Sequence, residues 1–165
     1  MRTIAVTGHM DLAEGTEKLL RDALPALLRE LSAGAGELTG VSCLAPGADS
    51  VFAEAVLDAG GALAVVLPFH DYRRSLTDPA VRERFDRLVA AASEVTVLPY
   101  PEASLAAFEA ANSALLRRAD ALVAVWDGQP PAKGGGTATT VAEAREAGLP
   151  VRVLWPEGAH RGAAR

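Results

Sequence analysis

The chain has 165 residues, of which half are hydrophobic and 22% are charged, and this is enough apolar material for one domain with a full core. Its net charge of −5 argues against broad binding to nucleic acid, which usually depends on a basic surface. No apolar run approaches the ~20 residues of a membrane-spanning helix. With no signal-peptide pattern and one cysteine, Cys43, which can form no internal disulfide, we expect a cytoplasmic protein.

Hydrophobic patterning predicts strands that alternate with helices along the whole chain. Glycine and proline mark most of the boundaries between them. In chain order we expect strand 3–7, helix 14–31, strand 38–44, helix 51–59, strand 63–67, helix 79–92, strand 94–98, helix 103–118, strand 121–126, helix 138–147 and strand 151–155. The stretch 69–78, which carries His70, Tyr72, Arg73 and Arg74, is expected to be a loop: either a mobile flap or a plain solvated segment.

Most of these strands are apolar on both faces, which is typical of a parallel sheet covered by helices on each side. The sequence therefore predicts an α/β fold: a single Rossmann-like three-layer domain with a mostly parallel sheet of about six strands. We expect this domain to span residues 1–156 and the Gly-, Ala- and Arg-rich residues 157–165 to form a flexible C-terminal tail. Ligands of such sheets bind beyond the carboxyl ends of the strands.

Two of the loops at expected strand ends carry small or hydrogen-bonding residues. After the first strand, Thr7 offers a hydroxyl, Gly8 an accessible amide and His9 an imidazole. After the second strand, Gly47 and Ala48 offer amides at the start of a helix, together with the carboxylate of Asp49 and the hydroxyl of Ser50. Asp49 and Ser50 are candidates for an ordinary N-cap as well as for ligand contact.

A third loop follows the fifth strand and carries the densest glycine cluster of the chain. It contains Trp126, Asp127, Gly128, Gly134, Gly135, Gly136 and Thr137. Glycine permits close approach of a ligand to the backbone, and the N-terminus of the following helix favours negative charge, so this loop is a candidate phosphate cradle. Asp127 is placed to accept hydrogen bonds from a sugar hydroxyl, and Trp126 is a candidate for stacking on a base or for a core position.

The motifs of these three loops, in their order along the chain, resemble the SLOG superfamily, the Rossmann-like group that includes the DNA-processing Smf/DprA proteins and the LOG (Lonely guy) proteins. The residues that carry the resemblance are Val6-Thr7-Gly8-His9, Ala45-Pro46-Gly47-Ala48-Asp49, the segment 119–128 and Gly135-Gly136-Thr137-Ala138. The resemblance extends from Ile4 to Pro156. It implies a nucleotide or nucleotide-derived ligand over the strand ends, with Asn112 near the pocket.

Two departures from the family pattern bear on catalysis. Relatives often carry arginine where this chain has Met10, and the glycosidic-bond enzymes of the group carry a glutamate where it has Thr140. Such enzymes need a carboxylate beside the anomeric carbon, which threonine does not supply. We therefore predict a module that senses or carries a nucleotide. An N-glycosidic-bond enzyme that uses Asp127 or Glu143 is the alternative, and DNA handling fits less well with the net charge.

The remaining expectations concern other groups and partners. No cluster of His, Cys and Asp has metal-ligand spacing, so we expect no metal site and no required cofactor apart from the nucleotide-type ligand. We expect no membrane partner. The apolar faces of helices 79–92 and 103–114 are candidates for packing a second subunit, so a homodimer is one expectation. The sequence identifies no effector protein.

Overall fold

The computed structural model describes residues 1–130 and 136–162 of the chain. Strands and helices alternate as the hydrophobic pattern predicts. In chain order the elements are β1 (Arg2–Gly8), α1 (Thr16–Leu31), β2 (Leu38–Ser42), α2 (Ala48–Asp58), β3 (Ala62–Leu67), α3 (Tyr72–Ser75), α4 (Pro79–Ala91), β4 (Glu94–Val97), α5 (Leu105–Arg118), β5 (Ala121–Val125), α6 (Thr137–Glu146) and β6 (Val151–Val153).

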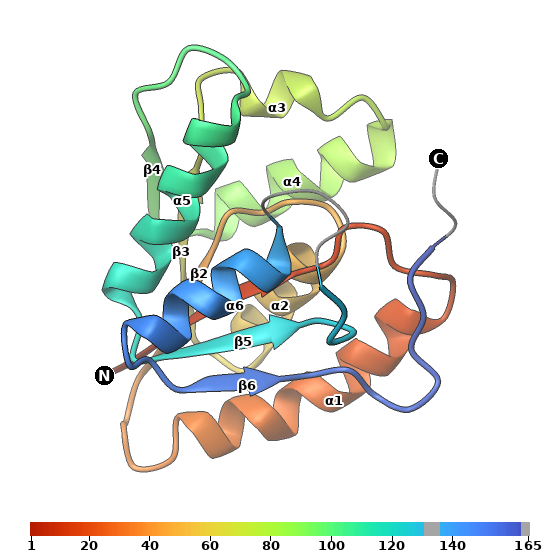
Figure 1. Cartoon of the computed structure of the whole chain (residues 1–165), viewed down its shortest axis with the longest axis vertical. Helices are drawn as coiled ribbons and strands as arrows, with labels where there is room; N and C mark the ends of the chain where they lie inside the picture. Colours follow the sequence, from red (N-terminus) through yellow and green to blue (C-terminus); the bar gives the residue numbers. More distant parts are fainter. Residues whose placement is uncertain (131–135, 163–165) are drawn as a thin grey trace.

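The described strands form one sheet in the order β4-β3-β2-β1-β5-β6, and every neighbouring pair in it is parallel. Strands β4 and β6 lie at its opposite edges (Figure 1). The chain moves outward from β1 to β4, then returns to the other side of β1 for β5 and β6. The order therefore reverses between β1 and β5, and such a switch point opens a crevice beyond the strand ends. The predicted fold class is confirmed.

Helices cover both faces of the sheet because the strand side chains alternate between two hydrophobic layers. In β1, Ile4 and Val6 pack with leucines of α1 and with Phe52 of α2. Ala5, between them, faces the opposite way and packs with Leu115 of α5. This alternation produces the three layers expected from the sequence.

The segment 69–78 differs from the loop that we expected. Its centre forms the single helical turn α3, and Tyr72 and Leu76 are buried with Phe69 and Phe85 in a third apolar cluster. A turn of four residues is too short to show a helical period, so the pattern indicated only a loop. Arg73 points away from this cluster and pairs with Asp86 of α4 at 2.7 Å.

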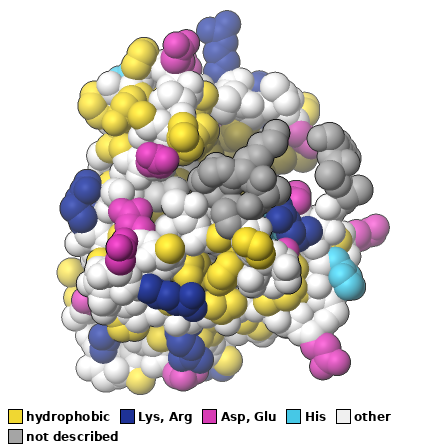
Figure 2. All heavy atoms as spheres, in the orientation of Figure 1, with side chains coloured by type: hydrophobic (Ala, Val, Ile, Leu, Met, Phe, Trp, Pro, Cys, Tyr) yellow, Lys and Arg dark blue, Asp and Glu magenta, His cyan; other side chains and the backbone are white. Residues whose placement is uncertain are grey.

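None of the helices in the described ranges is long and apolar enough to cross a membrane. Figure 2 shows hydrophobic side chains at the end of the molecule where the β4–α5 connection and the start of α5 lie. In that region Leu105 is 61% exposed and Phe108 is 44% exposed. The homodimer stays a prediction.

Candidate functional site

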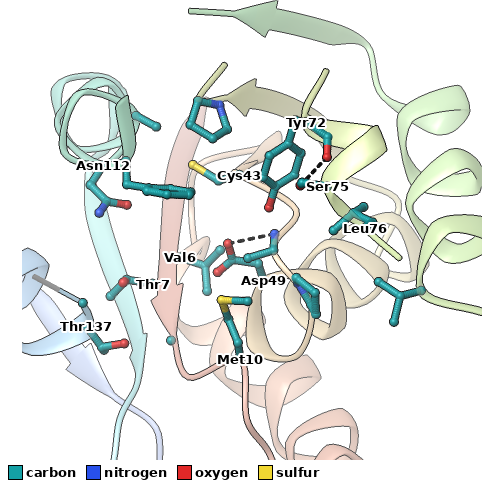
Figure 3. Close-up of a pocket in the computed structure, with 18 of the residues that line it drawn as sticks. Val6, Thr7, Met10, Cys43, Asp49, Tyr72, Ser75, Leu76, Asn112 and Thr137 are labelled. Carbon is teal, nitrogen blue, oxygen red and sulfur yellow. Dashed lines mark hydrogen bonds between the residues drawn. The ribbon is translucent and has the colours of Figure 1, made fainter. Parts of the chain in front are cut away.

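A cavity of about 540 Å³ opens beyond the carboxyl ends of β1, β2 and β3, between α2, α3 and α5 (Figure 3). The sequence-derived candidates that line it come from all three loops and from α5. They are Thr7, Gly8, Asp49, Asn112, Gly136 and Thr137. The fold therefore brings together residues that lie up to 130 positions apart in the chain.

Other candidates do not line this cavity. His9, Gly47, Ala48, Trp126, Asp127 and Gly128 lie beside it or behind its wall. Gly134 and Gly135 lie outside the described residues. The third loop is thus represented at the cavity by Gly136 and Thr137, at the start of α6.

Gly8 and Gly47 allow the first two loops to pack against one another. A Cβ on Gly47 would come within 2.7 Å of the main-chain oxygen of Met10, and Gly47 has a φ of +85°, which side chains rarely adopt. The amide of Ala48 donates to the main-chain oxygen of His9 at 3.2 Å. The amide of Ser50 donates to the main-chain oxygen of Gly47. The Ala48 amide, which we considered for a ligand, is therefore already used within the chain.

Asp49 is the central polar residue of the cavity. Its side chain is only 8% exposed, and its Oδ2 accepts one hydrogen bond, at 3.3 Å, from the amide of Ala45. Burial raises the pKa of this carboxyl to about 7, and the Ala45 amide offsets only part of the effect. The main chain beneath it is held by Ser42, whose hydroxyl donates to the Asp49 carbonyl. Asp49 is not an N-cap, since it is the second residue of α2 and Gly47 occupies the cap position.

Two weakly acidic groups, Cys43 and Tyr72, lie near Asp49 in the same wall (Figure 3). Burial raises the pKa of the Cys43 thiol, and the carboxyl of Asp49 raises it further. Burial, followed by Asp49 and Cys43, also raises the pKa of the Tyr72 hydroxyl. Both groups are therefore neutral at physiological pH.

The remaining wall is largely apolar and partly aromatic. Phe108 lines it from α5, four residues before Asn112, so that both lie on one face of the helix. The ring of Phe108 stands edge-on to Phe69, with centroids 5.9 Å apart, and Phe69 contacts Tyr72 in the same way. Sequence reasoning missed Phe108 and Tyr72. The spacing of Phe108 and Asn112 is a signal that would have identified the first of them.

His9 and Asp127 form a separate cluster next to the cavity. The amide of Asp127 lies 3.2 Å from Nε2 of His9 and donates to it, which joins the β1 loop to the β5 loop. The His9 ring stands edge-on to Trp155, with centroids 5.6 Å apart. Burial, and then the positive charge of Arg161, lower the pKa of His9, so the imidazole is neutral and able to accept this hydrogen bond.

Arg161 connects the end of the described chain to the same cluster. Its guanidinium contacts both carboxylate oxygens of Asp11 at 2.9–3.1 Å and lies 4.0 Å from Oδ2 of Asp127. The segment just before it is also anchored, since the amide of His160 donates to the hydroxyl of Thr16. Residues 157–162, which we expected in a tail, therefore lie against the start of the domain.

The side chains considered for catalysis lie away from the cavity. Glu143 is exposed on α6, and its Oε1 accepts a hydrogen bond from the hydroxyl of Ser113 on α5 at 2.7 Å. Thr140 is buried, and its hydroxyl lies 3.3 Å from the main-chain oxygen of Gly136, to which it donates. Asp127 belongs to the His9 cluster. Asp49 and Asp78 are the charged residues among the described cavity lining, which contains no Lys, Arg or His.

The residues 1–130 and 136–162 contain no group of three or more His, Cys, Asp or Glu side chains arranged to hold a metal ion.

Solved structures with a similar fold include DNA processing proteins. The chain resembles DNA processing protein A from Streptococcus pneumoniae with a TM-score of 0.66 and 20% identity, over 95% of this chain and 51% of that one. It resembles the same protein from Helicobacter pylori, described with its single-stranded DNA binding mode, with a TM-score of 0.67 and 14% identity, over 98% and 68%. The protein TM1055 gives 0.58 and 21%, over 92% and 72%.

These likenesses show a shared Rossmann-like fold. The chain spans about half the length of the pneumococcal protein. No protein-family model and no curated protein matches the sequence.

Proposed function

We propose that the cavity binds a nucleotide or a nucleotide-derived small molecule, and that the protein is a SLOG-type module that senses or carries this ligand. The observation that supports the proposal is the convergence of Asp49, Asn112 and Thr137 on one cavity. They come from α2, α5 and α6, and the cavity lies at the carboxyl end of the sheet, where ligands of open α/β folds bind. A volume of about 540 Å³ is in the range of small-molecule sites.

The two sides of the cavity differ in chemistry, which suits a ligand with two unlike ends. The side formed by Asp49 and Tyr72 is buried and able to accept hydrogen bonds, and Phe108 adds an aromatic surface from α5. The other side contains Gly136 and Thr137, at the start of a helix of ten residues. The amides of a first helical turn favour an anion, so this side fits a phosphate or the oxygens of a ribose.

Binding is favoured over cleavage of the ligand. A glycosidic-bond enzyme needs a carboxylate next to the anomeric carbon, but neither Glu143 nor Asp127 lines the cavity. The Glu143 carboxylate accepts a hydrogen bond from the Ser113 hydroxyl, and the Asp127 carboxylate accepts one from the Gln129 amide. Release of free base from a nucleoside monophosphate would instead establish the alternative, an N-glycosidic-bond enzyme that uses Glu143 or Asp127.

Single-stranded DNA is the competing ligand, because the Helicobacter pylori neighbour is described as binding it. The net charge of −5 argues against it. On the face shown in Figure 2, the Lys and Arg side chains of the described residues are scattered among Asp and Glu and form no continuous basic track. We therefore propose a small ligand, and DNA is included in the test.

Calorimetry of the purified chain with a panel of ligands tests this function. The panel comprises AMP, GMP, cyclic AMP, ADP-ribose and a single-stranded oligonucleotide. Binding of at least one mononucleotide or derivative is expected, and it should weaken in Asn112→Ala, which alters the cavity wall. Ser113→Ala is the matched control, because Ser113 is adjacent on α5 but bonds to Glu143. Silence across the small molecules, or salt-sensitive binding of the oligonucleotide alone, would contradict the proposal.

A further inference from the structure

The Asp49 carboxylate has hydrogen-bonding capacity that the chain itself does not use. Figure 3 shows it directed from α2 into the open centre of the cavity, toward the side that holds Asn112 and Thr137. Within the described chain, the Ala45 amide is its hydrogen-bond donor, at Oδ2. A carboxylate has about four acceptor positions, so Oδ1 and part of Oδ2 remain available to a ligand.

Among the described residues that line the cavity, none places a positive charge beside Asp49. The titratable groups of the described chain that act on it are the thiol of Cys43, just after β2, and the hydroxyl of Tyr72 on α3, and both are neutral. A buried carboxylate without a counter-charge is costly unless hydrogen-bond donors reach it. A ligand that brings hydrogen-bond donors to the Asp49 carboxylate is therefore favoured.

The α5 side of the same cavity favours a flat ligand. Phe108 is 44% exposed and lines the cavity, and Asn112 lies one turn further along α5. The edge-on contact with Phe69 supports the Phe108 ring and leaves its exposed part free for contact with an aromatic ligand. An aromatic ring that enters the cavity thus has an aromatic contact on α5 and an acceptor on α2.

Building on the proposed function, we infer that the cavity selects guanine among the nucleobases, with the imino N1–H and amino N2–H₂ groups donating side by side to the Asp49 carboxylate. Guanine is the standard base with two adjacent N–H donors on its pairing edge. Adenine and cytosine set one amino group beside an unprotonated ring nitrogen, whose lone pair would face the second carboxylate oxygen. Uracil sets one imino group between two carbonyl oxygens, which would also oppose the carboxylate.

The protonation state of Asp49 should also change which base the cavity prefers. Burial raises its pKa to about 7. Above that pH the anion accepts both guanine donors. Below it the neutral acid has one O–H donor and one C=O acceptor, which complement the ring nitrogen and amino group of adenine. The preference for guanine over adenine should therefore be strongest in mild base and decline in mild acid.

Calorimetric titration with GMP, IMP and AMP at about pH 8 and about pH 6 tests the inference, because these pH values lie on either side of the Asp49 pKa. IMP retains the imino donor and lacks the amino donor. We expect GMP to bind on the order of tenfold or more tightly than AMP in mild base, with IMP between them. Asp49→Asn replaces one acceptor with a donor and should shift the preference to AMP. Asp58→Asn, at the exposed end of α2, is the matched control.

The outcomes separate the inference from the proposed function. Equal affinities for GMP and AMP, or a preference that Asp49→Asn leaves unchanged, would overturn the selection of guanine while leaving nucleotide binding intact. Absence of binding by all three nucleotides and by the rest of the panel would overturn both. If Asp49→Asn does not fold, the native protein decides: equal affinities for GMP and IMP in mild base contradict the inference, because the amino donor would then make no contact with Asp49.

Discussion

Gly8, at the end of β1, lies so close to Ala48, at the start of α2, that a Cβ on Gly8 would come within 2.5 Å of the Ala48 Cβ. The same Cβ would come within 2.8 Å of the Val125 Cβ on β5. The glycines at positions 8 and 47 therefore allow the first two loops to meet at the strand ends, and this packing places Asp49 in the cavity wall.

Gly8→Ala should destabilise the fold, because neither Ala48 nor Val125 has a flexible side chain that could move aside. Overpacking of this kind typically costs ~1–3 kcal/mol, measured as a loss in the free energy of unfolding in urea. Gly162→Ala is the control, since a Cβ there meets nothing closer than 3.5 Å. Equal stability of the two variants would show that the loops are packed less closely than described.

Asp49→Asn should stabilise the ligand-free protein in mild base. The folded-state pKa of about 7 lies above the ordinary carboxyl value, so the contribution of Asp49 to stability is present at low pH and is lost as pH rises through 7. Thermal unfolding at about pH 8 should show the variant to be more stable, by an amount on the order of a few kcal/mol at most, and the difference should vanish near pH 4. A gain that is the same at both pH values, or one shared by Asp58→Asn, would contradict this account.

The pKa of His9 should respond in opposite directions to its two charged neighbours. Burial and Arg161 lower it, while Asp127 raises it. In an NMR titration, Arg161→Gln should therefore move the pKa of His9 up toward its ordinary value, and Asp127→Asn should move it further down. Arg152→Gln removes a surface pair with Glu30 and should leave His9 unchanged. Identical titration in all three variants would show that the end of the chain does not contact the strand ends.

The protein should release no free base from nucleoside monophosphates, even at high protein concentration and after long incubation. The physical reason is that the carboxylates of Glu143 and Asp127 bond to the Ser113 hydroxyl and the Gln129 amide, and neither residue lines the cavity. Chromatographic detection of free base provides the measurement. Release that disappears in Glu143→Gln or Asp127→Asn would establish the N-glycosidic alternative.

The sheet could be predicted from sequence because its signals are local. Ile4 and Val6 alternate with Ala5, and glycines punctuate the chain between elements, so strand and helix follow from neighbouring residues. The convergence of Asp49 and Thr137 also followed, because the carboxyl ends of parallel strands share one edge of the sheet.

Other parts of the site depend on contacts between distant segments. The sequence pattern predicts a loop around Tyr72, because a four-residue turn is too short to show which side chains are buried. In the structure Tyr72 packs with Phe69 and Phe85. The contact of Arg161 with Asp11 joins residues 150 positions apart. The proximity of Cys43 and Tyr72 to Asp49, which sets the electrostatics of the cavity, likewise emerges only when β2, α2 and α3 are folded together.

The most direct test of the central claim is an amide NMR titration of the labelled protein with GMP. Ligand binding in the described cavity predicts the largest shift changes at Thr7, Asp49, Asn112 and Thr137, which line it from four different elements. Changes concentrated instead around Arg29 and Gly60, which line a second cavity on the molecule, or around His9 and Asp127 alone, would contradict the claim.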